Sequence, residues 1–222
     1  MWSFVYDHYH EDYDCFHIGG DDMFPLVENM RLYLESEEVA LASNEGIFLP
    51  SSTKASSKQQ RLYIGGQFYL NGKKKKALVN GRGGYTLNKA ALKALVLSFP
   101  TCLPNVTMPN EDMNVAFCFR KKGILPFETK DMNGADRYMH MDPEFYFNFD
   151  PKKNPRFWYP KFNPLNRNAG PDHVAERSVS FHYVKGGDDI RRVHSILYEY
   201  CARLNVTLGP PVPTKWKDGR VG

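Results

Sequence analysis

Short apolar runs typical of β-strands alternate along this chain with longer segments whose apolar residues recur at helical spacing. Strands are expected at residues 14–19, 62–70, 124–127 and 178–184, and helices at residues 2–9, 24–34, 87–99, 110–122 and 188–204. Glycines at residues 80–85 predict a turn, and residues 128–177 are expected to be irregular. The alternation predicts an α/β layer fold, and such folds bind ligands beyond the carboxyl ends of their strands.

The composition narrows the function classes only slightly. The 222 residues suffice for one large domain or two small ones, and a net charge of +4 gives no argument for nucleic-acid binding. The dense basic run Lys73–Lys76 is interpreted as an exposed turn, with a patch for an anionic ligand as the alternative. No apolar run reaches the roughly 18 residues that a membrane-spanning helix needs.

The cysteines and sequons give limited information about the compartment. Four cysteines occur without a Cys-x-x-Cys pair, which argues against a structural zinc site and leaves disulfides open. Two Asn-x-Thr sequons, at Asn105 and Asn205, would be glycosylation acceptors in a secretory compartment.

An acidic pair, Asp21 and Asp22, follows the first predicted strand directly. Adjacent carboxylates at a strand end supply the hard oxygen ligands of a divalent cation, which would bind diphosphate oxygens. The plainer alternative is that Asp22 caps the following helix, and for an isolated Asp-Asp pair that alternative is favoured.

Two further stretches contain residues that suit catalysis. His182 lies in the alternating strand 178–184, where a histidine is usually a core residue, although imidazole also binds manganese-like metals beside carboxylates. Glu111 and Asp112 lie in the first turn of a predicted helix, where acids usually serve as caps. Either acid would also suit a general base that takes a proton from an acceptor hydroxyl.

Taken together and in order, these stretches resemble the core 1 β1,3-galactosyltransferase family, within the fringe-like group of family 31 glycosyltransferases. The resemblance covers roughly residues 2–200. It rests on seven segments: DCFHIGGDDM at 14–23 (family DWFLKADDDTYV), YIGGQF at 63–68 (YFGRRF), NGRGGYTLNKAAL at 80–92 (SGGAGYVLSKEAL), NEDM at 110–113 (EDxxxGxC, with Cys118), DMNGADRYMH at 131–140 (DxxGRERFHP), FWY at 157–159, and SVSFHYV at 178–184 (AVSFHYV).

The resemblance implies a role for each matching residue. It implies Mn²⁺ or a similar divalent metal held by Asp22 and His182, with Asp21 as the central acid of the metal motif. Asp112 would be the base, and Glu111 would hold the acceptor sugar or exchange roles with it. The other implied residues are Gly83, Gly84 and Tyr85 beside the donor hexose, Trp158 and Tyr159 on acceptor sugars, and a disulfide between Cys102 and Cys118.

The resemblance also implies a GT-A fold, an α/β nucleotide-binding layer. We expect a partial GT-A domain at residues 1–207 and a mobile tail at residues 208–222. In the family, about a hundred residues precede the acidic motif, so the start of this chain looks truncated, and a parallel sheet would lack its first strands. The implied full-length form is a single-pass type II Golgi membrane protein whose anchor lies outside this chain.

The implied activity is inverting transfer of galactose from UDP-galactose to the 3-hydroxyl of GalNAc on Ser or Thr, or to a related acceptor. The expected partners are a UDP-sugar donor and a glycoprotein or glycan acceptor, with no nucleic acid; a homodimer is left open. Gly20 stands where the family has an acid, and Ala116-Phe117 stands at its glycine position before Cys118. These departures keep an alternative open: a non-catalytic relative acting as a chaperone or glycan-binding protein, or an inactive fragment.

Overall fold

The computed structural model describes residues 1–44, 60–69, 77–79, 81–102, 110–150, 152–153, 159 and 168–195. Contacts divide the chain into two units, Met1–Tyr183 and Val184–Gly222. The first unit contains both strand and helix, in agreement with a mixed α/β fold. The expected boundary at residue 207, both sequons and the basic run Lys73–Lys76 lie outside the described residues.

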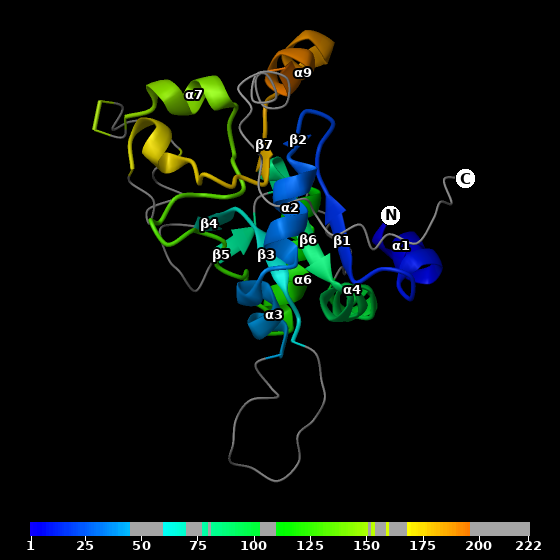
Figure 1. Ribbon diagram of the computed structural model, residues 1–222. Coiled ribbons are helices and arrows are strands. Elements are labelled where there is room, and N and C mark those ends of the chain that lie inside the picture. Colours follow the sequence, from blue (N-terminus) through cyan, green and yellow to red (C-terminus); the bar gives the residue numbers. More distant parts are fainter. Residues whose placement is uncertain are drawn as a thin grey trace. The chain divides into compact units, whose positions relative to one another are not determined.

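A three-stranded sheet lies at the centre of the first unit (Figure 1). Its order is β1 (Cys15–Ile18), β6 (Tyr85–Asn88) and β3 (Tyr63–Gly65). β6 is antiparallel to both neighbours, so every strand pair here is antiparallel, and the expected parallel sheet is wrong for these strands. The physical reason is that β1 and β3 run in the same direction, and the segment that connects them contains α2 (Val27–Leu34) and α3 (Glu37–Asn44). β6 inserts between these two strands in the opposite direction.

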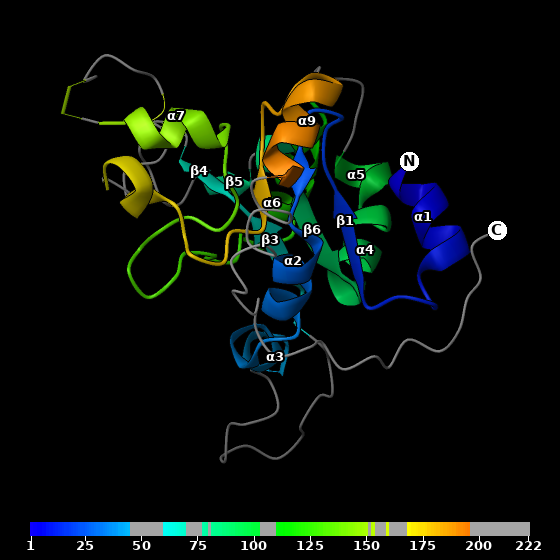
Figure 2. The ribbon, with the colours of Figure 1, turned by 45° about the horizontal axis from the view of Figure 1, so that its top comes forward.

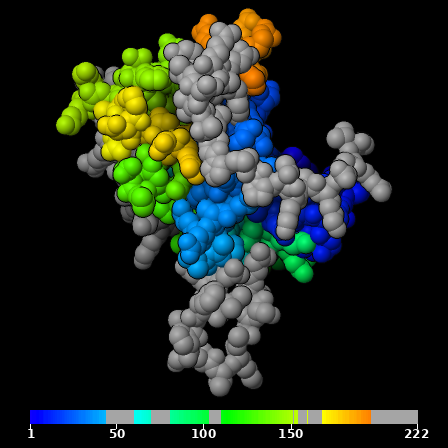
Figure 3. All heavy atoms as spheres, in the orientation of Figure 1, coloured from blue at the N-terminus to red at the C-terminus, as the bar shows by residue number. Residues whose placement is uncertain are grey.

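Helices cover both faces of this sheet (Figure 2). Successive strand side chains point to opposite faces, so Tyr63 enters one apolar cluster and Ile64 enters the other. The first cluster lies under α1 (Trp2–Tyr9), α4 (Lys89–Val96) and α6 (Glu111–Lys121). The second cluster includes residues of α2 and α3. The atoms of these helices are blue in Figure 3 and form part of the surface seen there.

Two short antiparallel ribbons complete the strands. β4 (Gln67–Tyr69) pairs with β5 (Ala77–Val79), and β2 (Phe24–Pro25) pairs with β7 (Ser180–Phe181). The helix expected from residue 24 therefore begins later, at Val27, because the backbone at residues 24–26 bonds to the β7 segment instead. The strand expected over residues 178–184 is likewise limited to β7.

The segment from Tyr85 to Cys102 differs from its expected single helix. Asn88 ends β6 and caps α4, since its side chain accepts a hydrogen bond from the Ala91 N–H at 2.9 Å. α4 ends at Val96, and Pro100 lies within the first turn of a further short helix, α5 (Phe99–Cys102), rather than after a helix.

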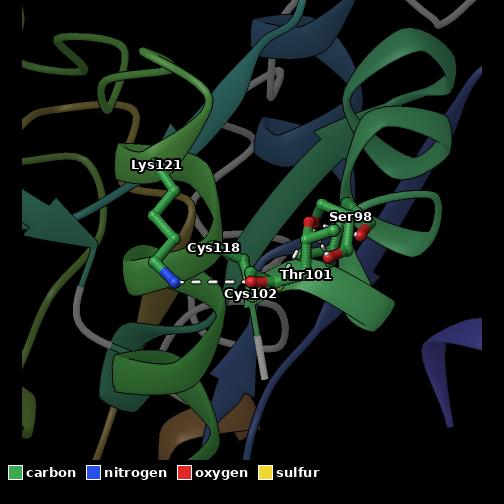
Figure 4. Close-up of a disulfide and its surroundings, with 6 residues drawn as sticks. Ser98, Thr101, Cys102, Cys118 and Lys121 are labelled. Atoms are coloured by element: carbon green, nitrogen blue, oxygen red, sulfur yellow. Dashed lines mark hydrogen bonds between the residues drawn. A yellow bond between two sulfur atoms is a disulfide. The ribbon is translucent and has the colours of Figure 1, made fainter. Parts of the chain in front are cut away.

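A disulfide joins Cys102 at the end of α5 to Cys118 in α6 (Figure 4). Both cysteines are buried in the first cluster. Ser98 and Thr101 lie beside the bond on the α5 side, and Lys121 of α6 donates to the Thr101 carbonyl at 3.4 Å. The bond therefore holds α5 against the helix that begins with Glu111 and Asp112.

The remaining described elements are short. Residues 128–177, expected to be irregular, include α7 (Pro143–Asn148) and a 3₁₀ turn at Gly170–His173. The strand expected at residues 124–127 is reduced to one isolated bridge between Phe127 and Ile64. The second unit contains α9 (Gly186–His194). None of the helices in the described ranges has the length and apolar character to cross a membrane.

Candidate functional site

The β2–β7 ribbon brings the acidic turn and His182 together. Phe24 pairs with Phe181, so the residues just before β2 face those just after β7. As a result, Nε2 of His182 lies 3.1 Å from Oδ1 of Asp22. The His182 side chain is buried, at 9% exposed, and the Asp22 side chain is 25% exposed, so solvent reaches the pair through Asp22. Asp21 is exposed beside it.

The other ring nitrogen of His182 fixes the tautomer of this side chain. Nδ1 lies 3.2 Å from the backbone oxygen of His140, and a carbonyl can only accept, so Nδ1 donates. A neutral His182 then turns the lone pair of Nε2 toward the carboxylate oxygen of Asp22. Two acceptors at 3.1 Å repel each other unless a proton or another cation lies between them.

The donor set suits a divalent metal. Metal-binding histidines commonly donate their second N–H to a backbone carbonyl, as His182 does. Two ligands at right angles, with bonds of about 2.1 Å, lie about 3.0 Å apart, and the Asp22–His182 separation is 3.1 Å. No group of three or more His, Cys, Asp or Glu side chains with metal-binding geometry occurs within the described ranges.

The residue after His182 has an unusual backbone. Tyr183 adopts φ of 60°, in the left-handed region that a side chain other than glycine rarely enters. Its ring lies 4.0 Å from the His182 ring, and the guanidinium of Arg82 lies 5.8 Å from the centre of the Tyr183 ring. Strained backbone of this kind concentrates at functional sites. Here it coincides with the end of the ribbon that positions His182.

Gly83 and Gly84, expected beside a donor sugar, lie in a tight turn against the same corner. A Cβ on Gly83 would lie 3.0 Å from the Met139 carbonyl oxygen, and Gly84 has φ of +74°. A Cβ on Gly84 would lie 2.7 Å from Nε2 of His17. Only glycine fits these two positions without displacing a neighbour.

Glu111 and Asp112 begin α6 on the other side of this turn. Asp112 accepts the Gly81 N–H through Oδ2 at 2.9 Å and the Met113 N–H through Oδ1 at 2.8 Å. Glu111 accepts two hydrogen bonds through a single oxygen, Oε1, from Trp2 at 2.8 Å and from Tyr85 at 2.6 Å. The two acids thus have different surroundings although they are neighbours in sequence.

The three aromatic residues expected at the sugar sites have different positions. Tyr85 is 1% exposed and its hydroxyl is used by Glu111, so it is a core residue beneath the site. Burial raises the pKa of Tyr85 far above its ordinary value, and the negative charge of the neighbouring Glu111 adds to this effect. Tyr159 is completely buried, so its ring has no exposed face on which a sugar could stack. Trp158 lies outside the described residues.

A second Asp–His pair, which the sequence pattern did not reveal, lies in the interior. Nε2 of His173 is 3.1 Å from Oδ2 of Asp136, and their side chains are 0% and 8% exposed. Lys130 forms a short ion pair with Asp136, and the Tyr159 hydroxyl lies 3.3 Å from Asp136 and 2.9 Å from His173. The only sequence signal was the loose family match at residues 131–140, which gave no indication of the partner His173.

Comparison with known proteins supports a glycosyltransferase-like relative. No protein-family model matches the chain. The chain is 21% identical over 189 residues to the Xenopus laevis protein named glycoprotein-N-acetylgalactosamine 3-beta-galactosyltransferase 1. The match covers 84% of this chain but 46% of the Xenopus protein, so the chain spans less than half the length of that relative.

Proposed function

We propose that this chain acts as an inverting, metal-dependent hexosyltransferase that moves galactose from UDP-galactose to the 3-hydroxyl of GalNAc on Ser or Thr, or to a related acceptor. The similarity to the Xenopus galactosyltransferase supports glycosyl transfer in general. The observation that carries the proposal is the Asp22–His182 pair, a carboxylate and an imidazole 3.1 Å apart, in which the second ring nitrogen faces a backbone carbonyl. The mixed α/β architecture is compatible with a GT-A fold.

Asp22 and His182 would hold the metal, with Mn²⁺ the ion that suits a mixed carboxylate and imidazole set. When bound, such an ion neutralises charge on the diphosphate that leaves the sugar. The carbonyl of His140 keeps Nε2 of His182 turned toward the metal position. Asp21, exposed beside Asp22, adds negative charge that attracts the cation.

The acids of α6 would act on the acceptor. Asp112 is the proposed base: it takes the proton of the acceptor hydroxyl as that oxygen attacks the anomeric carbon from the face opposite UDP, which inverts the configuration. Backbone hydrogen bonds from Gly81 and Met113 hold its carboxylate in place at the start of α6. Glu111 would bind the acceptor sugar, and the turn of Gly83 and Gly84 would lie beside the donor hexose.

A second candidate is a non-catalytic glycan-binding or chaperone relative. One observation favours it: Gly20 stands where the family motif has an acid, which leaves less negative charge at the metal position. The retained Asp22–His182 pair argues against it, because a carboxylate and an imidazole at this separation suit a metal ion. If the chain is the proposed enzyme, it would work in the Golgi.

The test is UDP release with UDP-galactose, an aryl α-GalNAc acceptor and Mn²⁺. Asp22→Ala removes a metal ligand, so we expect turnover to fall at least about 100-fold, equivalent to about 2.7 kcal/mol of transition-state stabilisation. Asp12→Ala is the matched control, since Asp12 is an exposed acid in the segment before β1. Equal turnover in both variants, or none in the wild type with glycan binding retained, favours the second candidate.

A further inference from the structure

The carboxylate of Glu111 is held at one oxygen by two aromatic donors from distant parts of the chain. Nε1 of Trp2 donates to Oε1 at 2.8 Å, and the hydroxyl of Tyr85 donates to the same atom at 2.6 Å. The two donors are themselves 3.0 Å apart. Trp2 lies 109 residues from Glu111 in sequence, so this contact exists only because the fold brings α1 to the start of α6.

Both donors are rigidly supported. Trp2 is 6% exposed and Tyr85 is 1% exposed, and their rings pack against each other at 5.9 Å. Tyr63 contacts the Tyr85 ring edge-on at 5.6 Å. An aromatic side chain has only two rotatable bonds, so its polar tip is well fixed once the ring is packed. The Glu111 side chain is exposed, and these two bonds therefore remove freedom that it would otherwise have.

The two acids of α6 differ in what remains for a ligand. Both oxygens of Asp112 accept backbone N–H groups. In the part of the chain that the structure describes, Oε2 of Glu111 accepts no hydrogen bond, because both of its donors bind Oε1. A carboxylate fixed by one oxygen presents the other in a defined place, which is how a hydroxyl-bearing ligand is oriented.

We propose that Trp2 and Tyr85 are positioning residues that fix Oε1 of Glu111 so that Oε2 binds a hydroxyl group of the acceptor sugar. This inference rests on the proposed transferase function and deepens it. Tyr85 contributes through Glu111 and does not touch the donor. The acceptor recognised in this way is a sugar with a second free hydroxyl besides the attacking one, because the Glu111 carboxylate can accept a hydrogen bond from it.

Tyr85→Phe is the cleanest test, because it removes one hydroxyl and keeps the ring. Trp2→Phe is less clean because Trp2 also lines a pocket of about 390 Å³ beside β1. We expect Tyr85→Phe to lower galactose transfer to the GalNAc acceptor about 10- to 100-fold through misplacement of Glu111. UDP-galactose hydrolysis to water and UDP affinity stay within about 2-fold, because neither step uses the acceptor site.

Tyr138→Phe is the matched control. Tyr138 is also fully buried, but its hydroxyl contacts Thr86 at 3.4 Å in the other apolar cluster. We expect this variant to keep wild-type transfer. A second measurement excludes a general structural effect: in a Glu111→Ala background, Tyr85→Phe should cause no further loss, because nothing is left to position.

The outcomes separate this inference from the proposed function. The inference alone is overturned if Tyr85→Phe lowers transfer equally in the wild-type and Glu111→Ala backgrounds. It is also overturned if Tyr85→Phe and Tyr138→Phe lower transfer equally. If the wild type transfers no galactose but binds the acceptor by ligand-observed NMR, and Tyr85→Phe weakens that binding, the inference stands and the transferase function fails. A wild type that neither transfers to the acceptor nor binds it overturns both.

Discussion

Two Asp–His pairs with nearly the same geometry lie in different surroundings. In both, an Nε2 lies 3.1 Å from a carboxylate oxygen, and in both the other ring nitrogen faces a backbone carbonyl. The Asp136–His173 pair is closed, because Lys130 supplies a cation and Tyr159 a hydroxyl within the interior. In the Asp22–His182 pair the Asp22 side chain is 25% exposed, and in the described residues no lysine or arginine forms an ion pair with Asp22.

The difference shows how one pair of residue types serves two purposes. Burial by itself would raise the pKa of Asp136, but the hydrogen bond from His173 and the charge of Lys130 hold that pKa below its ordinary value. The interior Asp136 carboxylate is therefore charged and satisfied by the protein itself, and it stabilises the fold. Asp22 has solvent on one side and no lysine or arginine partner among the described residues, so a cation from solution can reach it.

The largest expected effect comes from opening the closed pair. Asp136→Asn leaves Lys130 as an uncompensated charge in the interior, so we expect the free energy of unfolding to fall by about 3–5 kcal/mol. Asp22→Asn should change it by less than about 1 kcal/mol, since the site is partly solvated. Urea unfolding followed by circular dichroism measures both. Equal destabilisation by the two variants would remove the distinction between the pairs.

Adding metal should sharpen the comparison at the open pair. An ion that binds only the folded chain stabilises it by about 2.7 kcal/mol at 100 times its Kd, so Mn²⁺ should raise the melting temperature. The rise should vanish in Asp22→Ala and in His182→Ala and persist in Asp12→Ala. Differential scanning fluorimetry over a Mn²⁺ series gives the result, and an undiminished rise in Asp22→Ala would contradict the assignment.

The smallest expected effect is a difference in acid sensitivity. Because the pKa of folded Asp136 lies below the unfolded value of about 3.9, its contribution is complete above about pH 4 and is lost as the pH falls through the folded value. Wild-type stability should therefore fall on acidification below about pH 4, by up to about 1.4 kcal/mol per pH unit from this group. The free energy of unfolding of Asp136→Asn should depend less on pH in this range, and that of Asp22→Asn should follow the wild type. Identical pH dependence in all three proteins would show that Asp136 is not the group that titrates.

The helices were predictable where local chemistry marks their ends. Glu111 and Asp112 at the start of α6 and Gly123 after its end bound a helix that the structure contains. The expected helical start at Leu87 is wrong for a specific reason. The helical spacing of apolar residues arises because one cluster buries Leu87, Ala91 and Leu95. The backbone of Leu87, however, pairs in the sheet with β1 and β3.

The site was predictable as a set of residues and less so as an arrangement. Family motifs selected Asp22, His182 and the acids of α6, and the Cys102–Cys118 bond is the one that the resemblance implied. The contacts of Glu111 with Trp2 and of Asp136 with His173 join positions whose separation follows no local period. Such contacts come from strand register and helix packing, which a single sequence does not encode in any short pattern.

The Cys102–Cys118 bond limits the conditions under which this chain can be produced in its folded form. The bond closes a loop with a separation of 16 residues, and its loss would release α5 from the helix that begins with Glu111 and Asp112. Burial and the nearby Asp14 raise the pKa of Cys15 to about 11, so that thiol exchanges slowly and competes little for the partner cysteines. Recombinant work should therefore use an oxidising host compartment, since a reducing cytosol would yield a chain with a loosened acid-bearing helix.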